Sequence, residues 1–117
     1  MDLDHAIQKH AEWKLKFRGA ISNKETLDAT TITKDNCCDL GKWLHDEGKI
    51  KYAKLASHTG CVAKHAAFHV EAGKIAVAIN AKKYTEAEAM LGGSTPYASA
   101  SSDVAVAINR LKKEAGI

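Results

Sequence analysis

Three histidines and one cysteine in this sequence have the spacing and surroundings of metal ligands. His10 lies within an apolar pattern near the N-terminus, and His65 and His69 lie within a second one. A separation of four residues places the last two imidazoles on one side of a helix, about one turn apart, which suits two bonds to a single metal. A neutral imidazole buried without a partner costs about 1 to 3 kcal/mol, and a shared metal removes that cost.

Cys38 is the natural fourth ligand. It belongs to the stretch Asn36-Cys37-Cys38-Asp39-Leu40-Gly41-Lys42-Trp43-Leu44 and lies at the expected start of a helix. There the positive end of the helix dipole favours the thiolate that zinc requires. Three nitrogens and one sulfur favour zinc over magnesium or calcium, which prefer oxygen. Cys61, four residues before His65, is the rival sulfur ligand, whereas Cys37 is expected to be a small packing residue.

Two long helices should carry the histidines. The first is expected over residues 3 to about 21, where apolar positions step by three and four only if His10 is counted among them. The second is expected over about 57 to 81, and His65 and His69 again occupy positions that should be buried. In both helices, imidazoles therefore face the core.

The segment between these helices has to deliver Cys38. Residues 22 to 35 are polar and rich in threonine, which predicts an ordered crossover loop. A short helix should follow from about residue 37 to 47, with Asp35 or Asn36 as its N-cap and with Gly48 ending it. Gly41 should allow another helix to approach closely.

The C-terminal segment contains conflicting signals. Gly92-Gly93-Ser94-Thr95-Pro96 would ordinarily indicate a break. However, the apolar stripe from Ala87 to Leu111 keeps its steps of three and four through these residues. This favours one long helix kinked near Pro96, with two separate helices as the alternative.

The fold class predicted from these elements is all-α. We expect an antiparallel four-helix-type bundle with an additional short helix carrying the cysteine ligand, in a single domain over residues 1–117. The formal charge of +3 is spread along the chain, so neither a nucleic-acid nor a membrane-surface role is supported. An odd number of cysteines, a polar N-terminus and no long apolar run together predict a cytoplasmic protein.

Three stretches resemble the signatures of one bacterial family, the chemoreceptor zinc-binding (CZB) domain. They are His10-Ala11-Glu12-Trp13-Lys14, Cys38-Asp39-Leu40-Gly41-Lys42-Trp43-Leu44 and His65-Ala66-Ala67-Phe68-His69, in the family's order. The resemblance implies zinc bound by His10, Cys38, His65 and His69 in a helical bundle that forms a homodimer. It also implies a signalling partner, such as a chemoreceptor or a diguanylate cyclase module.

The expected function is regulatory zinc binding rather than catalysis, because four protein ligands leave no open position for water or substrate. The domain would modulate signal transduction, such as chemotaxis or cyclic-di-GMP synthesis, through zinc occupancy or through oxidation of Cys38. The alternative is a purely structural, zinc-stabilised dimerisation module. A hemerythrin-like di-iron carrier is disfavoured, because the inner positions beside the histidines are alanine, valine and phenylalanine.

The other histidines and the two tryptophans are given simpler roles. His5, His45 and His58 are expected to be solvated or capping residues. Trp13 and Trp43 are expected to be core walls that screen the metal.

Overall fold

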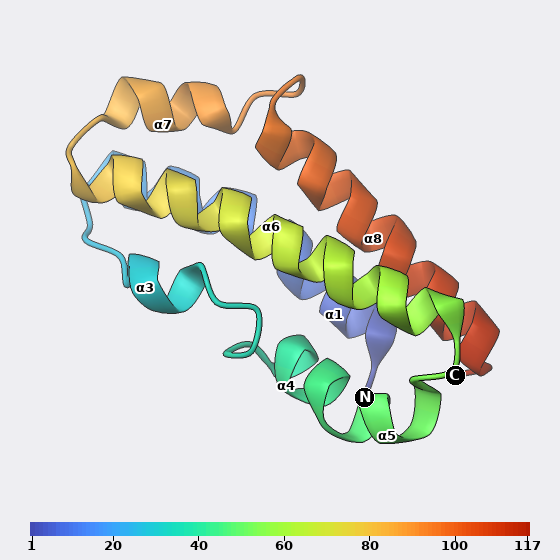
Figure 1. Ribbon diagram of the computed structural model, residues 1–117. Helices are drawn as coiled ribbons and strands as arrows, with labels where there is room; N and C mark the ends of the chain where they lie inside the picture. Colours follow the sequence, from blue (N-terminus) through green and yellow to red (C-terminus); the bar gives the residue numbers. More distant parts are fainter.

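The computed structural model describes residues 1–117 and consists of helices joined by turns, without strands (Figure 1). The all-α prediction is confirmed. None of the helices is long and apolar enough to cross a membrane. The elements are α1 (Leu3–Ala11), α2 (Trp13–Asn23), α3 (Ala29–Ile32), α4 (Asp39–His45), α5 (Glu47–Tyr52), α6 (Ala56–Asn80), α7 (Tyr84–Met90) and α8 (Pro96–Ala115).

Helix α6 is the centre of the arrangement, and the other long elements lie along it (Figure 1). It runs opposite to α8, because Ser57 at its start donates its backbone N–H to Glu114 near the end of α8, at 3.1 Å. It runs parallel to α1 and α2, because Asn80 at its end accepts from the backbone N–H of Leu27, at 2.7 Å. The chain from α3 to α5 returns along another side of α6 and carries Cys38.

The two long helices that should carry the histidines are confirmed, with one interruption. The first is divided at Glu12 into α1 and α2, and the two parts continue in nearly the same direction. The apolar stripe predicted from the sequence forms the core, in which Phe17, Phe68, Ile108 and Leu111 are fully buried. The crossover between α2 and α4 is ordered and includes the single turn α3.

The prediction of one long C-terminal helix is wrong, because α7 and α8 are separate. Thr95 has an extended backbone and caps α8: its hydroxyl accepts from the N–H of Ala98 at 3.2 Å and donates to the carbonyl of Gly92 at 2.8 Å. Pro96 then occupies the first helical position, where a missing N–H costs nothing. The stripe keeps its phase because α7 and α8 both pack onto the same core.

The start of the short helix also differs from the prediction. Cys38 itself is the N-cap of α4, in place of Asp35 or Asn36. Gly48 lies inside α5 and does not end α4, which stops at the non-helical residue Asp46. Gly41 does permit a close approach, but by the loop rather than by a helix, since a Cβ there would lie 1.7 Å from the carbonyl oxygen of Asp35.

We therefore expect Gly41→Ala to destabilise the fold by about 2 kcal/mol, because the obstructing atom belongs to the backbone and overpacking of this kind costs roughly 1 to 3 kcal/mol. Denaturant unfolding measures the change. The matched control is Gly19→Ala in α2, where nothing lies within 4 Å of the added methyl group. That variant should gain about 0.5 to 1 kcal/mol from helix propensity. Equal stability of the two variants would contradict the role given to Gly41.

Candidate metal centre

The four candidate ligands meet at one place, although they come from two helices, α1 and α6, and from the start of a third, α4. The Nε2 atom of His65 lies 3.1 Å from Nε2 of His10 and 3.0 Å from Nε2 of His69. The Sγ atom of Cys38 lies 3.2 Å from His65, 3.6 Å from His69 and 3.9 Å from His10, measured to Nε2 in each case. All four donor atoms lie within 4.8 Å of one another.

These separations match the edges of a zinc tetrahedron. With Zn–N bonds of about 2.0 to 2.1 Å and a Zn–S bond of about 2.3 Å, tetrahedral ligands are separated by about 3.3 Å between nitrogens and about 3.6 Å between nitrogen and sulfur. The two N···N distances involving His65 are slightly shorter than the first value, and the three N···S distances scatter around the second. The donor set therefore fits zinc in size as well as in chemistry.

Hydrogen bonds on the outer side fix two of the imidazoles. The Nδ1 atom of His10 lies 2.7 Å from the carbonyl oxygen of Ala6, and Nδ1 of His69 lies 2.7 Å from the carbonyl oxygen of Ile32. A carbonyl only accepts, so each Nδ1 carries the proton and each Nε2 presents a lone pair. Two lone pairs thus point into the same small space, an arrangement that a bound cation stabilises.

His65 completes the nitrogen set in a different way. It is fully buried, and its Nδ1 atom has no hydrogen-bond partner. Its position is set by packing, with its ring edge-on to the rings of His10 and His69 at centroid distances of 5.0 and 4.5 Å. Its Nε2–H could satisfy only one of the two facing lone pairs, and the other is left with a weak hydrogen bond from the Cys38 thiol, whose Sγ lies 3.6 Å from His69 and 3.9 Å from His10.

Cys38 has two roles at once, since it caps α4 and faces the histidines. Its Sγ accepts from the backbone N–H of Gly41 at 3.3 Å. Burial raises the pKa of the Cys38 thiol, and hydrogen bonds from Gly41 and Leu40 partly offset that rise. Zinc binding at neutral pH therefore has to displace the thiol proton, since the metal ligand is the thiolate.

Burial keeps the three histidines neutral and ready for a metal. It lowers the pKa of His65 to about 2, with the imidazoles of His69 and His10 adding to the shift. Burial also lowers the pKa values of His10 and His69, against the opposing effect of their carbonyl hydrogen bonds. At neutral pH none of these rings is a charged imidazolium, so each has one nitrogen free of a proton.

The cluster is closed on the histidine side and open on the sulfur side. His10, His65 and His69 are each less than 5% exposed, whereas Cys38 is half-buried. Cys38 and His10 line a cleft of about 480 Å³ between α1 and the start of α4, with Trp13 as part of its wall. Small molecules can therefore reach the sulfur but not His65 or His69.

Cys61, the rival sulfur ligand, lies outside the cluster. It is fully buried between α6 and α8, and burial raises its pKa to about 12.

Cys37 is half-buried beside the cleft, and its sulfur contacts the side-chain oxygen of Asn36 at 3.5 Å, so packing is not its only contact. Trp13 and Trp43 are partly buried against the core, as expected of walls.

One of the remaining histidines is misplaced by the sequence prediction. His58 is 5% exposed, and its Nε2 contacts the carbonyl oxygen of Leu44 at 3.0 Å, so it ties the end of α4 to α6. The sequence pattern does indicate that His58 is buried, since residue 58 lies seven positions before His65 and hence on the same helical stripe. His5 and His45 are exposed, as predicted, and His45 forms an ion pair with Asp35 at 2.8 Å.

An all-α fold with a buried three-histidine, one-cysteine cluster defines a metal-binding module of the zinc type. The sequence model of the family described as "Chemoreceptor zinc-binding domain" (CZB) matches residues 10–76, more than half of the chain. The chain therefore belongs to the CZB family, and zinc is its cofactor. No curated protein and no solved structure matches it.

The lowered histidine pKa values predict acid sensitivity of the metal-free protein. Below about pH 6.5 the unfolded state binds protons at these histidines that the folded state does not bind. Their contribution to stability is therefore fully present above their unfolded pKa of about 6.5. That contribution is lost as the pH falls from about 6.5 towards the folded pKa of His65, which is about 2. We expect the free energy of unfolding of the metal-free protein to fall by on the order of 1 kcal/mol per pH unit per histidine.

Urea unfolding at pH 7.5, 6.5, 5.5 and 4.5, with chelator present, measures this slope. His65→Gln should flatten it, whereas the control His5→Gln, at an exposed position, should leave it unchanged. A slope that is the same in all three proteins would contradict the assignment.

Proposed function

We propose that this protein is a zinc-binding regulatory domain in which His10, Cys38, His65 and His69 ligate one zinc ion. The observation that carries the proposal is the convergence of two fixed imidazole lone pairs, a third imidazole and a thiol within 4.8 Å. A cluster with this composition lacks the oxygen donors that calcium and magnesium need.

The role of the zinc is structural and regulatory rather than catalytic. Four protein ligands complete a tetrahedron, so no position is left for an activated water. Zinc in such a site links α1, the start of α4 and α6, which are far apart in sequence. Gain or loss of the metal would therefore change how tightly these three elements are held together.

The wider assembly follows from the family resemblance. We propose a single domain over residues 1–117, a four-helix-type bundle in which the broken segment α3–α5 takes the place of one helix. It would act in the cytoplasm as a homodimer and transmit its state to a signalling protein, in chemotaxis or cyclic-di-GMP synthesis. Support for this role comes from the family match and from the closed zinc-type cluster.

Oxidation of Cys38 is a second way to change the site. Cys38 is the one candidate ligand that is only half-buried; it lines the cleft together with His10, and its sulfur accepts a hydrogen bond from the N–H of Gly41. Hypochlorous acid would oxidise the thiolate to a sulfenic acid and be reduced to chloride, which removes the anionic ligand. Loss of that charge weakens one of the four metal bonds.

A purely structural zinc module is the alternative, favoured by the absence of an open coordination position. Zinc would then stabilise the fold and the dimer without reporting any stimulus. A Cys38→Ala protein that folds, stays dimeric and leaves the partner's output unchanged would support this alternative.

Metal stoichiometry tests the ligand assignment. We expect one zinc per chain in the wild type and in Cys61→Ala, because the Cys61 sulfur lies outside the cluster. Cys38→Ala should lose zinc, or bind it at least about 100-fold more weakly, since outer-shell changes alone cost 10- to 100-fold. Elemental analysis and competition with a chromogenic chelator measure both quantities. Unchanged zinc affinity in Cys38→Ala would overturn the assignment.

Selective oxidation tests the redox mechanism. One equivalent of hypochlorous acid should modify Cys38 and release zinc, while Cys61, buried and with a raised pKa, stays unmodified. Mass spectrometry locates the modification, and the chromogenic chelator follows the zinc. Cys37→Ser serves as the control, and it should release zinc as the wild type does. Oxidation of Cys38 without zinc release would count against this mechanism but not against zinc binding.

A further inference from the structure

Cys37 is a second sulfur beside the candidate metal centre, and zinc binding gives it no role. It directly precedes Cys38, and both residues are half-buried and line the cleft between α1 and the start of α4. The Cys37 thiol donates to the side-chain oxygen of Asn36 at 3.5 Å, and no other hydrogen bond holds it. An oxidant that enters this cleft therefore meets two neighbouring sulfurs, of which one is a proposed zinc ligand.

Few interactions restrain the backbone around Cys37. Residues 35 to 37 form no hydrogen bond between backbone groups, and the two cysteines lie in a bend that ends where α4 begins. The segment is anchored on one side by the contact of Asp35 with His45, at 2.8 Å, and on the other by the first turn of α4. A change of conformation between these anchors would be local and would keep Cys37 beside the cleft.

We propose that Cys37 is the resolving thiol for oxidised Cys38, and that the two residues join in a reversible disulfide. The inference rests on the oxidation of Cys38 in the proposed function and assigns the step that follows it. In the first step, the Cys38 thiolate gains the hydroxyl group of hypochlorous acid and chloride is released, which gives a sulfenic acid. In the second step, the Cys37 sulfur bonds to the Cys38 sulfur while the S–O bond breaks. The hydroxyl leaves with the thiol proton of Cys37 as water.

Resolution would protect the zinc ligand from irreversible damage. A sulfenic acid that meets more oxidant passes to sulfinic and sulfonic acids, which thiol reductants do not reverse. Cys38 is only half-buried, so a second oxidant molecule can reach it through the cleft. Attack by the adjacent Cys37 is intramolecular, which favours it over a reaction with a molecule from solution. The disulfide sulfur is neutral, so the site stays without its anionic ligand until the bridge is reduced.

The short link between the two residues makes the bridge easy to reduce. Their peptide bond is trans, and consecutive Cα atoms lie about 3.8 Å apart across a trans peptide. Disulfides usually join Cα atoms about 4.4 to 6.8 Å apart, and strained ones are more reducible. A dithiol reductant would supply two electrons and two protons, become a disulfide itself and restore both thiols. Such a bridge suits a switch rather than a permanent link.

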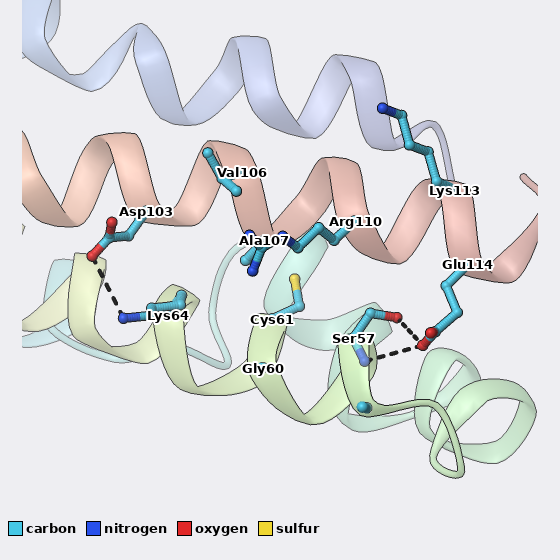
Figure 2. A pocket seen from close by; sticks show the side chains of 11 residues that line it. Ser57, Gly60, Cys61, Lys64, Asp103, Val106, Ala107, Arg110, Lys113 and Glu114 are labelled. Atoms are coloured by element: carbon cyan, nitrogen blue, oxygen red, sulfur yellow. Dashed lines mark hydrogen bonds and ion pairs between the residues drawn. The ribbon is translucent and has the colours of Figure 1, made fainter.

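Cys61 is not placed to resolve Cys38. It is fully buried between α6 and α8, where Figure 2 shows it beside a groove of about 710 Å³. That groove shares no lining residue with the cleft of Cys37 and Cys38. Cys61 also belongs to the hydrophobic core, which would have to open before its sulfur could react. The resolving role therefore falls to Cys37.

Peptide mapping of the oxidised, zinc-loaded protein tests the proposal. Trypsin cleaves after Lys34 and Lys42, so Cys37 and Cys38 lie on one peptide and Cys61 lies on another. About one equivalent of hypochlorous acid should lower the mass of the first peptide by about 2 Da, the two hydrogens lost, and block alkylation of both its sulfurs. A Cys38 sulfinic acid beside a free Cys37 thiol, or a disulfide between the two peptides, would overturn the inference.

The matched variant is Cys37→Ser, which should bind one zinc per chain and release it on oxidation as the wild type does. The two proteins should differ in recovery after excess oxidant, treatment with a dithiol, removal of the dithiol and addition of zinc. The wild type should regain at least about five times as much zinc as the variant, because Cys38 of the variant is carried to sulfinic acid. Cys61→Ala should recover as the wild type does.

Equal recovery of zinc by the wild type and Cys37→Ser would also overturn the inference. A wild type that holds no zinc before oxidation would instead overturn the proposed function. Peptide mapping of that metal-free protein still reports whether Cys37 and Cys38 join, so the two failures are distinguishable.

Discussion

The structure depends on the convergence of four metal-ligating atoms that satisfy one another only weakly by hydrogen bonds. His10 and His69 both present lone pairs at Nε2, because their Nδ1 protons are committed to carbonyls at 2.7 Å. His65 can offer one N–H at most, and burial lowers its pKa to about 2, so it does not supply a second by protonation. The Cys38 thiol can donate only a weak hydrogen bond to the remaining lone pair, with Sγ at 3.6 Å from His69 and 3.9 Å from His10. A zinc ion replaces these contacts with four metal bonds, and for structural zinc sites its binding energy, about 10 kcal/mol or more, is folding energy.

The outer hydrogen bonds explain why the crossover segment has its particular shape. The carbonyl of Ile32 that holds His69 belongs to the last turn of α3, where helix carbonyls have no partner within the helix. The N–H of Gly41 that holds the Cys38 sulfur belongs to the first turn of α4, where N–H groups are similarly free. The end of α3 thus orients the His69 imidazole, and the start of α4 orients the Cys38 sulfur. A loop without these helix ends would hold both side chains less firmly.

The sequence predicted the parts that depend on periodicity and missed those that depend on local geometry. His10, His65 and His69 were identifiable because each completes an apolar stripe. The separation of α7 from α8 was not, because both helices pack on one core and the stripe runs through the break. Likewise, no pattern shows that Cys38 is itself the cap, since Asp35 and Asn36 just before it are the more usual capping residue types.

The proposed ligands differ in how strongly the rest of the fold holds them. His65 and His69 sit within a 25-residue helix, and His10 lies on α1, which packs against α8. Cys38 begins a helix of only seven residues, too short to persist without tertiary contacts. Besides the sulfur, α4 is held by the buried side chains of Leu40 and Leu44. Two polar contacts add to this: His58 with the carbonyl of Leu44, and His45 with Asp35. Release of the sulfur would therefore act first on α4, the shorter element, while His65 and His69 remain fixed by the packing of α6.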